Sequence, residues 1–200
     1  MDYPISGKLE NCIMGYLVNS FTMCDIGVDK MSVVSSEKMK QPMVGAILTV
    51  SDTRTKETDI GGKCVRELLE QNQLQVVDSY ICKDNIENIV QKLKYWLSLK
   101  EIDFIITTGG TGIAKRDVTI EAITPLLEKE IVGFGECFRW LSFTEDVGTR
   151  AIASRALAGT VNDKVLFALP GSVKAVQLAM NRLIIPELKH LVFEATKHRR

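Results

Sequence analysis

Histidine is scarce in this chain of 200 residues, and its cysteines form no recognisable pair. The two histidines, His190 and His198, lie in the last eleven residues, which argues against a histidine-based triad or metal site. The five cysteines include no CxxC motif and no two at zinc-ligand spacing. An odd number of unpaired cysteines is typical of free thiols in a reducing compartment, so we expect a cytoplasmic protein with mostly buried thiols.

Net charge and long apolar runs are also missing. Lys plus Arg and Asp plus Glu each total 25, which removes the usual electrostatic argument for binding nucleic acid. No run of about 18 or more apolar residues occurs, so no segment is predicted to span a membrane. The first residues lack a basic leader and do not read as a signal peptide. We therefore expect neither nucleic acid nor a membrane as a partner.

Residues 1–42 differ from the rest of the chain because they show no sustained hydrophobic period. Two explanations are open: a poorly ordered N-terminal extension, or a translation start further along, for instance at Met31. Mass spectrometry of the native N-terminus would separate them. We assign the folded domain to residues 43–195.

From Met43 onward, strand-like and helix-like segments alternate. The run MVGAILTVS (43–51) is typical of a strand buried on both faces, and LQVVDSYIC (74–82) and DFIITT (103–108) predict two more strands. Between them, residues 61–73 and 85–99 have apolar residues at helical spacing, the second with Asp84 as its expected N-cap. This alternation predicts an α/β fold with a mostly parallel sheet covered by helices on both faces.

The second half of the chain continues with three further predictions. Residues 118–130 favour a helix broken near Pro125. Residues 157–169 contain two apolar runs around Asn162-Asp163, which predicts a strand, a turn and a strand. Residues 173–192 predict a long helix kinked or split at Pro186.

Polar and small residues gather where the predicted parallel strands end. Four such segments are VSDTRT (50–55), CKDN (82–85), TTGGTGIAKRD (107–117) and LPGS (169–172). In open α/β sheets, ligands bind outside the carboxyl ends of the strands, where these loops converge. We therefore expect the four segments to line one ligand site.

The segment after the third strand has the composition of an anion-binding loop. Gly109, Gly110 and Gly112 allow positive φ and a close approach of the backbone to a ligand. Backbone N–H groups and the hydroxyls of Thr108 and Thr111 can then contact an anion. The spacing matches neither GxGxxG nor a P-loop, and a tight strand-to-helix turn is the alternative reading.

Two acids, Asp84 and Asp117, are the candidate metal ligands and catalytic residues. Each could instead only cap the helix that follows it, as we expect Asp59 to do for the first helix. Because Lys115 and Arg116 precede Asp117 on a loop suited to phosphate, we favour carboxylates that hold Mg²⁺ together with ligand phosphates. The other predicted ligand contacts are Ser51, Asp52, Pro170, Gly171 and Ser172.

The motifs LTVSDTRT, TTGGTGIAKRDVTIEA, GFGECFR, SRALAG and LPGS occur in this order between about residues 43 and 192. Together they closely resemble the MoaB/Mog proteins of molybdenum cofactor biosynthesis, and the MoaB branch in particular. The resemblance implies a three-layer α/β/α domain that binds molybdopterin and assembles as a homotrimer or a dimer of trimers. Other proteins of the pathway are expected partners.

The resemblance also implies an activity. Active relatives adenylylate molybdopterin with Mg-ATP and release pyrophosphate. Asp84 and Asp117 match their two important acids, whereas the glycine loop and Ser172 match ligand-binding positions. Lys115 and Arg116 match basic residues that are expected to face ligand phosphate.

Two other functions remain open at this point. The first is a molybdopterin-binding protein of the same pathway without catalysis, because some members of the MoaB branch lack the activity. The second is a general phosphate- or nucleotide-binding regulatory domain. Pyrophosphate release from Mg-ATP in the presence of molybdopterin separates the enzyme from both.

Overall fold

The computed structural model describes residues 42–199, so the predictions for the N-terminal extension fall almost entirely outside the described residues. Six strands form one sheet in the order β2-β1-β3-β6-β5-β4. Their bounds are β1 Val44–Val50, β2 Gln75–Cys82, β3 Phe104–Thr108, β4 Lys129–Glu130, β5 Leu157–Val161 and β6 Lys164–Leu169. The α-helices are α1 Ile60–Gln71, α2 Ile86–Ser98, α3 Thr119–Ile123, α4 Val132–Glu145, α5 Val173–Ala179 and α6 Ile185–Thr196, joined by shorter turns η2 Thr124–Leu126, η3 Gly148–Ala153, η4 Met180–Ile184 and η5 Lys197–Arg199.

The sheet is mostly parallel, as the alternation of segments predicted. Strand β1 pairs in parallel with β2 and β3, and β3 pairs in parallel with β6. Strand β5 runs antiparallel to both of its neighbours, β6 and β4. The carboxyl ends of β2, β1, β3 and β6 therefore lie at one edge of the sheet, which is the edge where the four predicted loops begin.

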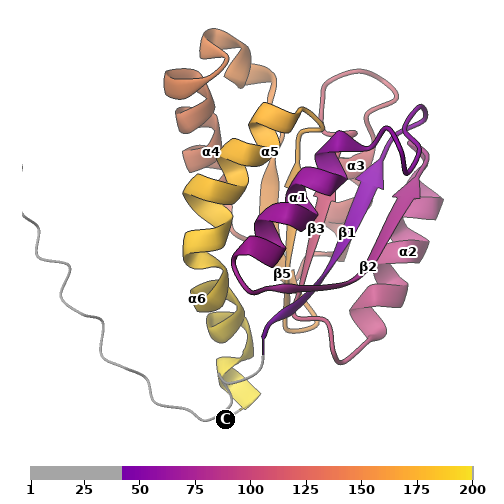
Figure 1. Ribbon diagram of the computed structural model, residues 1–200, viewed down its shortest axis with the longest axis vertical. Coiled ribbons are helices and arrows are strands. Elements are labelled where there is room, and N and C mark those ends of the chain that lie inside the picture. The colour runs from indigo at the N-terminus through magenta and orange to yellow at the C-terminus, as the bar shows by residue number, and fades with distance from the viewer. Residues whose placement is uncertain (1–41, 200) are drawn as a thin grey trace, which may run out of the picture. The chain divides into compact units, whose positions relative to one another are not determined.

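Apolar side chains on the two faces of the sheet form two separate cores. Ile47, Ile106 and Phe167 belong to a core shared with α1, α4, α5 and α6. Their neighbours along the strands point to the opposite face, and Leu48 and Ile105 pack there with α2 and α3. Figure 1 shows α2 and α3 on the far side of the sheet from α1, α5 and α6. The predicted three-layer α/β/α arrangement is confirmed.

The predicted strand–turn–strand at residues 157–169 is the hairpin β5–β6. Asn162 and Asp163 form its two-residue turn with φ of 49° and 60°, the left-handed pair that a tight hairpin requires. The predicted break near Pro186 is also present. The π-helical turn η4 separates α5 from α6 and ends just before Pro186, which lies in the first turn of α6. Because proline has no N–H and its ring crowds the preceding turn, the wider π turn accommodates it.

Residues 118–130 match the predicted helix only in part: the break near Pro125 is present, but the residues after it are not helical. Only Thr119–Ile123 is α-helical; η2 contains Pro125, and the chain then extends into β4. The amide of Glu128 donates to the carbonyl of Thr160 (2.9 Å), so the last residues of this segment pair with β5 and do not continue the helix. A two-residue strand made by a distant partner leaves no local pattern in the sequence.

The expected capping residues are only partly correct. Asp59 accepts a hydrogen bond from the amide of Gly62 (2.8 Å) and caps α1 as predicted. The cap of α2 is Asn85, whose side chain accepts from the amide of Asn88 (2.9 Å), and not Asp84. The N-cap position of α3 is Val118, with no side-chain cap bond, so Asp117 does not cap that helix either. The carboxylates of Asp84 and Asp117 are therefore not committed to helix capping.

Two smaller expectations concern cysteines and membranes. The cysteines within residues 42–199 are all free; Cys64 and Cys82 are buried and Cys137 is exposed. In the same range, no helix combines the length and the apolar character needed to cross a bilayer.

Candidate functional site

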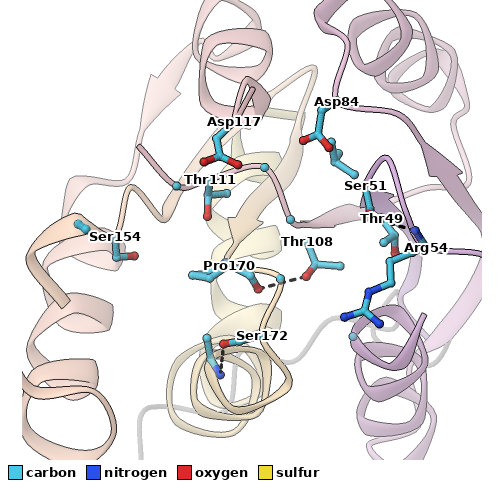
Figure 2. Close-up of a pocket in the computed structure, with 18 of the residues that line it drawn as sticks. Thr49, Ser51, Arg54, Asp84, Thr108, Thr111, Asp117, Ser154, Pro170 and Ser172 are labelled. Carbon is cyan, nitrogen blue, oxygen red and sulfur yellow. Dashed lines mark hydrogen bonds between the residues drawn. The ribbon is translucent and has the colours of Figure 1, made fainter. Parts of the chain in front are cut away.

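A pocket of about 550 Å³ opens at the carboxyl edge of the sheet. Residues from all four predicted strand-end loops line it: Ser51 and Asp52 after β1, Asp84 after β2, the glycine loop after β3, and residues 170–172 after β6. Figure 2 shows Asp84 and Asp117 on one side of this pocket, with Ser172 on the side opposite. The structure thus brings together segments that lie more than a hundred residues apart in the sequence.

All but one of the predicted site residues line the pocket. The exception is Lys115, which is exposed and lies outside the lining. Its neighbours Arg116 and Asp117 do line the pocket. The residues that the structure brings together are Ser51, Asp52, Asp84, Thr108, Gly109, Gly110, Thr111, Gly112, Arg116, Asp117, Pro170, Gly171 and Ser172.

The glycine loop needs its glycines for two different reasons. Gly109 and Gly110 have φ of 98° and 62°, which only glycine adopts readily. A Cβ on Gly109 would also lie 2.2 Å from the carbonyl oxygen of Val50. Gly112 does not have positive φ, contrary to the prediction; a Cβ there would lie 2.6 Å from Oδ2 of Asp117. The first two glycines shape the backbone, and the third makes room for a carboxylate.

Both candidate metal ligands pack against this loop. A Cβ on Gly110 would lie 2.9 Å from Oδ1 of Asp84, and Gly112 is in similar contact with Asp117. Oδ2 of Asp117 also accepts a hydrogen bond from the amide of Ala114 (2.9 Å), which holds the carboxylate beside the loop. The two acids therefore approach the same few residues of backbone from opposite ends of the loop.

The carboxylates give the pocket excess negative charge. Burial raises the pKa of Asp84, and the charges of Asp52 and Asp117 raise it further; the backbone amide hydrogen bond with Asp52 and the guanidinium of Arg116 act in the opposite direction. The amide of Asp84 donates to Oδ1 of Asp52 at 3.3 Å, so these acids are adjacent. Carboxylates that repel one another in this way are suited to sharing a cation.

The metal expected from the sequence fits this donor set only with help from a ligand. Within residues 42–199, no group of three or more His, Cys, Asp or Glu side chains has the arrangement of a metal site. Asp84 and Asp117 provide hard oxygen donors, as Mg²⁺ prefers, and Mg²⁺ is commonly held by one or two carboxylates plus substrate phosphates. The residues present therefore fit a cation that arrives with a phosphorylated ligand.

Hydrogen bonds of backbone groups and hydroxyls hold the floor of the pocket together. Thr108 donates to the carbonyl of Pro170 (3.2 Å), and the amide of Gly109 donates to the carbonyl of Leu169 (3.0 Å). Ser172 caps α5, and its hydroxyl accepts from the amide of Ala175 (3.3 Å). The first two bonds join the glycine loop to the LPGS segment, and the bonds of Thr108 and Ser172 are drawn in Figure 2.

A buried carboxylate lies under the loop that follows β1. Asp59 is only 9% exposed, and its Oδ2 accepts from the hydroxyl of Thr49 at 2.6 Å. A Cβ on Gly62 would lie 2.2 Å from the same oxygen. Both Thr49 and Asp59 line the pocket. From the sequence, Asp59 is predicted only to cap a helix, and Thr49 is not among the predicted site residues.

One wall of the pocket contains none of the site residues predicted from the sequence. We call it the helical wall. It consists of residues from α4, η3 and the positions next to them: Phe138, Ser142, Asp146, Val147, Arg150, Ala151, Ala153 and Ser154. The first three recur at intervals of four residues, so one side of α4 faces the pocket. This spacing was available in the sequence, but it is also the spacing of an ordinary core-facing helix.

Arg54 also lines the pocket, although it was not among the site residues predicted from the sequence. Its guanidinium donates to the carbonyl of Thr58 (3.0 Å), and its amide donates to Oγ of Ser51 (3.3 Å). Figure 2 shows Arg54 and Ser154 on opposite sides of the pocket. The segment VSDTRT did contain the signal, because an arginine in a strand-end loop adds positive charge to a site suited to anions.

Fold and pocket together define a class: an α/β protein with its ligand site at the carboxyl edge of a mostly parallel sheet. Comparison with known proteins narrows this class. Residues 46–190 match the family model described as "Probable molybdopterin binding domain". The chain is 58% identical over 162 residues to molybdenum cofactor biosynthesis protein B of Staphylococcus aureus (strain COL), covering 80% of this chain and 96% of that protein.

Solved structures agree with the sequence comparison. A crystal structure of a molybdenum cofactor biosynthesis protein B matches with a TM-score of 0.76 at 50% identity, over 80% of this chain and 98% of the other. The tungsten cofactor synthesizing protein MoaB from Pyrococcus furiosus matches with a TM-score of 0.70 at 34% identity, over 78% and 98%. The chain belongs to the MoaB/Mog family of molybdenum cofactor biosynthesis proteins.

Proposed function

We propose that the protein binds molybdopterin and adenylylates it with Mg-ATP, releasing pyrophosphate. The observation that carries this proposal is the placement of Asp84 and Asp117 against a glycine loop that opens into the pocket. Such a loop favours phosphate groups, and the paired acids favour the cation that accompanies them. Family membership supplies molybdopterin as the phosphorylated substrate.

In the proposed reaction, an oxygen of the terminal phosphate of molybdopterin forms a bond to the α-phosphorus of ATP. The bond between that phosphorus and the bridging oxygen to the β-phosphate breaks, and pyrophosphate leaves. Bound Mg²⁺ would neutralise phosphate charge during this exchange. Phosphoryl chemistry of this kind depends mainly on positioning and charge stabilisation, and needs no covalent role for the protein.

The chain's own residues have distinct roles in this scheme. Asp84 and Asp117 hold the cation, and amides of the glycine loop contact phosphate oxygens. Arg54 and Arg116, which both line the pocket, offset the charge of the polyphosphate. The helical wall covers the opposite side and excludes water from the reacting groups.

The test is a pyrophosphate assay with purified protein, Mg-ATP and molybdopterin, run beside a binding measurement for the pterin. Pyrophosphate released in proportion to adenylylated pterin supports the enzyme. Pterin binding without pyrophosphate would instead assign a carrier role in the same pathway. No pterin binding would remove molybdopterin from the proposal and leave a general phosphate-binding domain.

We further propose that the protein is cytoplasmic and assembles as a homotrimer or a dimer of trimers, with other proteins of the cofactor pathway as partners. Exposed apolar side chains on α4 and η3 support assembly: Trp140 is 63% exposed, Phe143 52% and Ile152 84%. Light scattering after size-exclusion chromatography gives the number of subunits, and a monomeric mass at micromolar concentration would refute the assembly.

A further inference from the structure

Arg155 has an unusual set of partners for a residue outside the strand-end loops. It follows η3 and precedes β5, yet its guanidinium donates to two carbonyl oxygens of the glycine loop. Nη2 contacts the carbonyl of Asp117 at 2.9 Å, and Nε contacts the carbonyl of Thr111 at 3.4 Å. These two carbonyls bracket residues 112–116, so one side chain grips both ends of that segment.

Glu121 holds the guanidinium in place from the other side. Its carboxylate accepts from Nη1 of Arg155 at 2.5 Å and from Nη2 at 3.3 Å. The pair is only partly shielded, with side-chain exposures of 31% for Arg155 and 47% for Glu121. An exposed ion pair stabilises a fold little, so its value here lies in geometry: a planar fork with several donors can hold two carbonyls and a carboxylate at fixed angles.

The segment that Arg155 brackets also positions the carboxylate of Asp117. The amide of Ala114 donates to Oδ2 of Asp117, and the amide of Asp117 donates back to the carbonyl of Ala114, both at 2.9 Å. These reciprocal bonds form a small closed turn within the loop. If the carbonyls of Thr111 and Asp117 separate, this turn opens and the carboxylate loses its fixed direction.

We propose that Arg155 is a positioning residue: oriented by Glu121, it clamps the carbonyls of Thr111 and Asp117 and thereby fixes the Asp117 carboxylate toward the pocket. The clamp itself is a property of the unliganded protein. Its consequence for catalysis rests on the proposed function, because only there does Asp117 have a cation to hold.

The first arm of the test measures the clamp without any ligand. Arg155→Met keeps the length of the side chain and removes every donor, and Arg182→Met is the matched control. Arg182 also pairs with a glutamate, Glu145 at 2.6 Å, but neither residue lines the pocket. We expect amide hydrogen exchange over residues 112–118 to speed up about tenfold or more in Arg155→Met and to stay unchanged in Arg182→Met.

A conservative variant tests whether the planar guanidinium of Arg155 is needed or only its positive charge. Arg155→Lys retains one positive charge near Glu121 but cannot bond two carbonyls and a carboxylate in one plane. We expect it to exchange nearly as fast as Arg155→Met. If residues 112–118 exchange at the wild-type rate in Arg155→Met, the clamp does not exist. If they do so only in Arg155→Lys, a positive charge at this position is sufficient, which also contradicts the proposal.

The second arm measures the consequence for the site. The Mg²⁺ concentration that gives half-maximal pyrophosphate release should rise about tenfold in Arg155→Met and not in Arg182→Met, since a misdirected carboxylate binds the cation less well. An unchanged Mg²⁺ requirement alongside faster exchange would refute the catalytic consequence. If wild-type protein releases no pyrophosphate, the proposed function fails, and the exchange arm still decides the clamp.

Discussion

The two walls of the pocket are built in different ways. The strand-end wall presents backbone amides, small hydroxyls and acids such as Asp52, Asp84 and Asp117, on loops that begin at four parallel strands. The helical wall presents side chains such as Ser142 and Arg150 from α4 and η3. The first wall is fixed by the sheet and its hydrogen bonds, so we expect it to hold the phosphates of the proposed reaction. The second depends on helix packing, and it suits contacts that select and cover the ligand.

The largest effect is expected on the strand-end wall, from Gly110→Ala. An alanine at this position would have to adopt a φ of 62°. Its methyl group would lie 2.3 Å from Oγ1 of Thr119 and 2.9 Å from Oδ1 of Asp84. Strain on the order of 1–3 kcal/mol, together with the clash, should weaken pterin binding about a hundredfold. Gly133→Ala is the control, since nothing lies within 4 Å of its Cβ position. Calorimetry that gave both variants wild-type affinity would show that the ligand avoids the loop.

The next effect concerns turnover on the same wall. Asp117→Asn keeps the size of the side chain and removes the charge that would hold Mg²⁺. We expect pterin affinity within about threefold of wild type and pyrophosphate release slower on the order of a hundredfold. Glu101→Gln makes the same change of charge in the α2–β3 connection, at the opposite edge of the sheet, and should leave the rate unaltered. Parallel losses of binding and rate would mean that Asp117 is mainly structural.

The helical wall gives the third and smaller effect. Arg150 lines the pocket and Lys115 does not, although the sequence favoured Lys115. Arg150→Ala should raise the KM for ATP or pterin about three- to tenfold with little change in kcat, because it removes binding without touching the reacting groups. Lys115→Ala should change neither constant. The reverse ranking of the two variants would return Lys115 to the site.

The smallest effect is on stability, from Asp84→Asn. The pKa of Asp84 is raised in the folded protein, first by burial and then by neighbouring acids. Between its ordinary and its raised pKa, the folded state therefore binds more protons than the unfolded state, and stability falls as pH rises through that window. Asparagine carries no such penalty, so without Mg²⁺ the variant should melt higher at pH 7 by at most about 3 °C.

This gain depends on pH in a defined direction. The difference in Tm between Asp84→Asn and wild type should be greatest above the raised pKa and should shrink as pH falls toward the ordinary carboxyl range, where Asp84 is protonated in both states. Adding Mg²⁺ together with ATP should reverse the ranking at pH 7, because only the wild-type carboxylate can help hold the cation that accompanies the phosphates. A variant that melts lower at every pH without Mg²⁺ would contradict the charge argument.

The contrast between the walls also explains how much could be predicted from the sequence. Buried strands such as β1 and β3 appear as continuous apolar runs, and parallel pairing then places their following loops at one edge. Asp84, Gly110 and Ser172 were predicted on this basis to share one site, and all three line the same pocket. The order of buried strands is enough for this prediction, because it does not depend on side-chain packing.

The remaining features depend on contacts between distant segments. Strand β4 exists because it pairs with β5, and α4 turns Ser142 toward the pocket because of how the helix packs. Arg155 shows no local pattern that points to the carbonyls of Thr111 and Asp117. Helical spacing alone does not distinguish a pocket-facing side from a core-facing one.

The hydrogen bonds between the glycine loop and residues 169–170 limit how far this motif can be transplanted. Gly109 and Thr108 each bond to a carbonyl of the distant segment, and a Cβ on Gly171 would lie only 3.3 Å from the Cα of Gly109. Grafting TGGTG alone onto another sheet would transfer the glycine loop without the segment whose carbonyls it bonds. A working graft needs both segments, on adjacent parallel strands in the same register as β3 and β6.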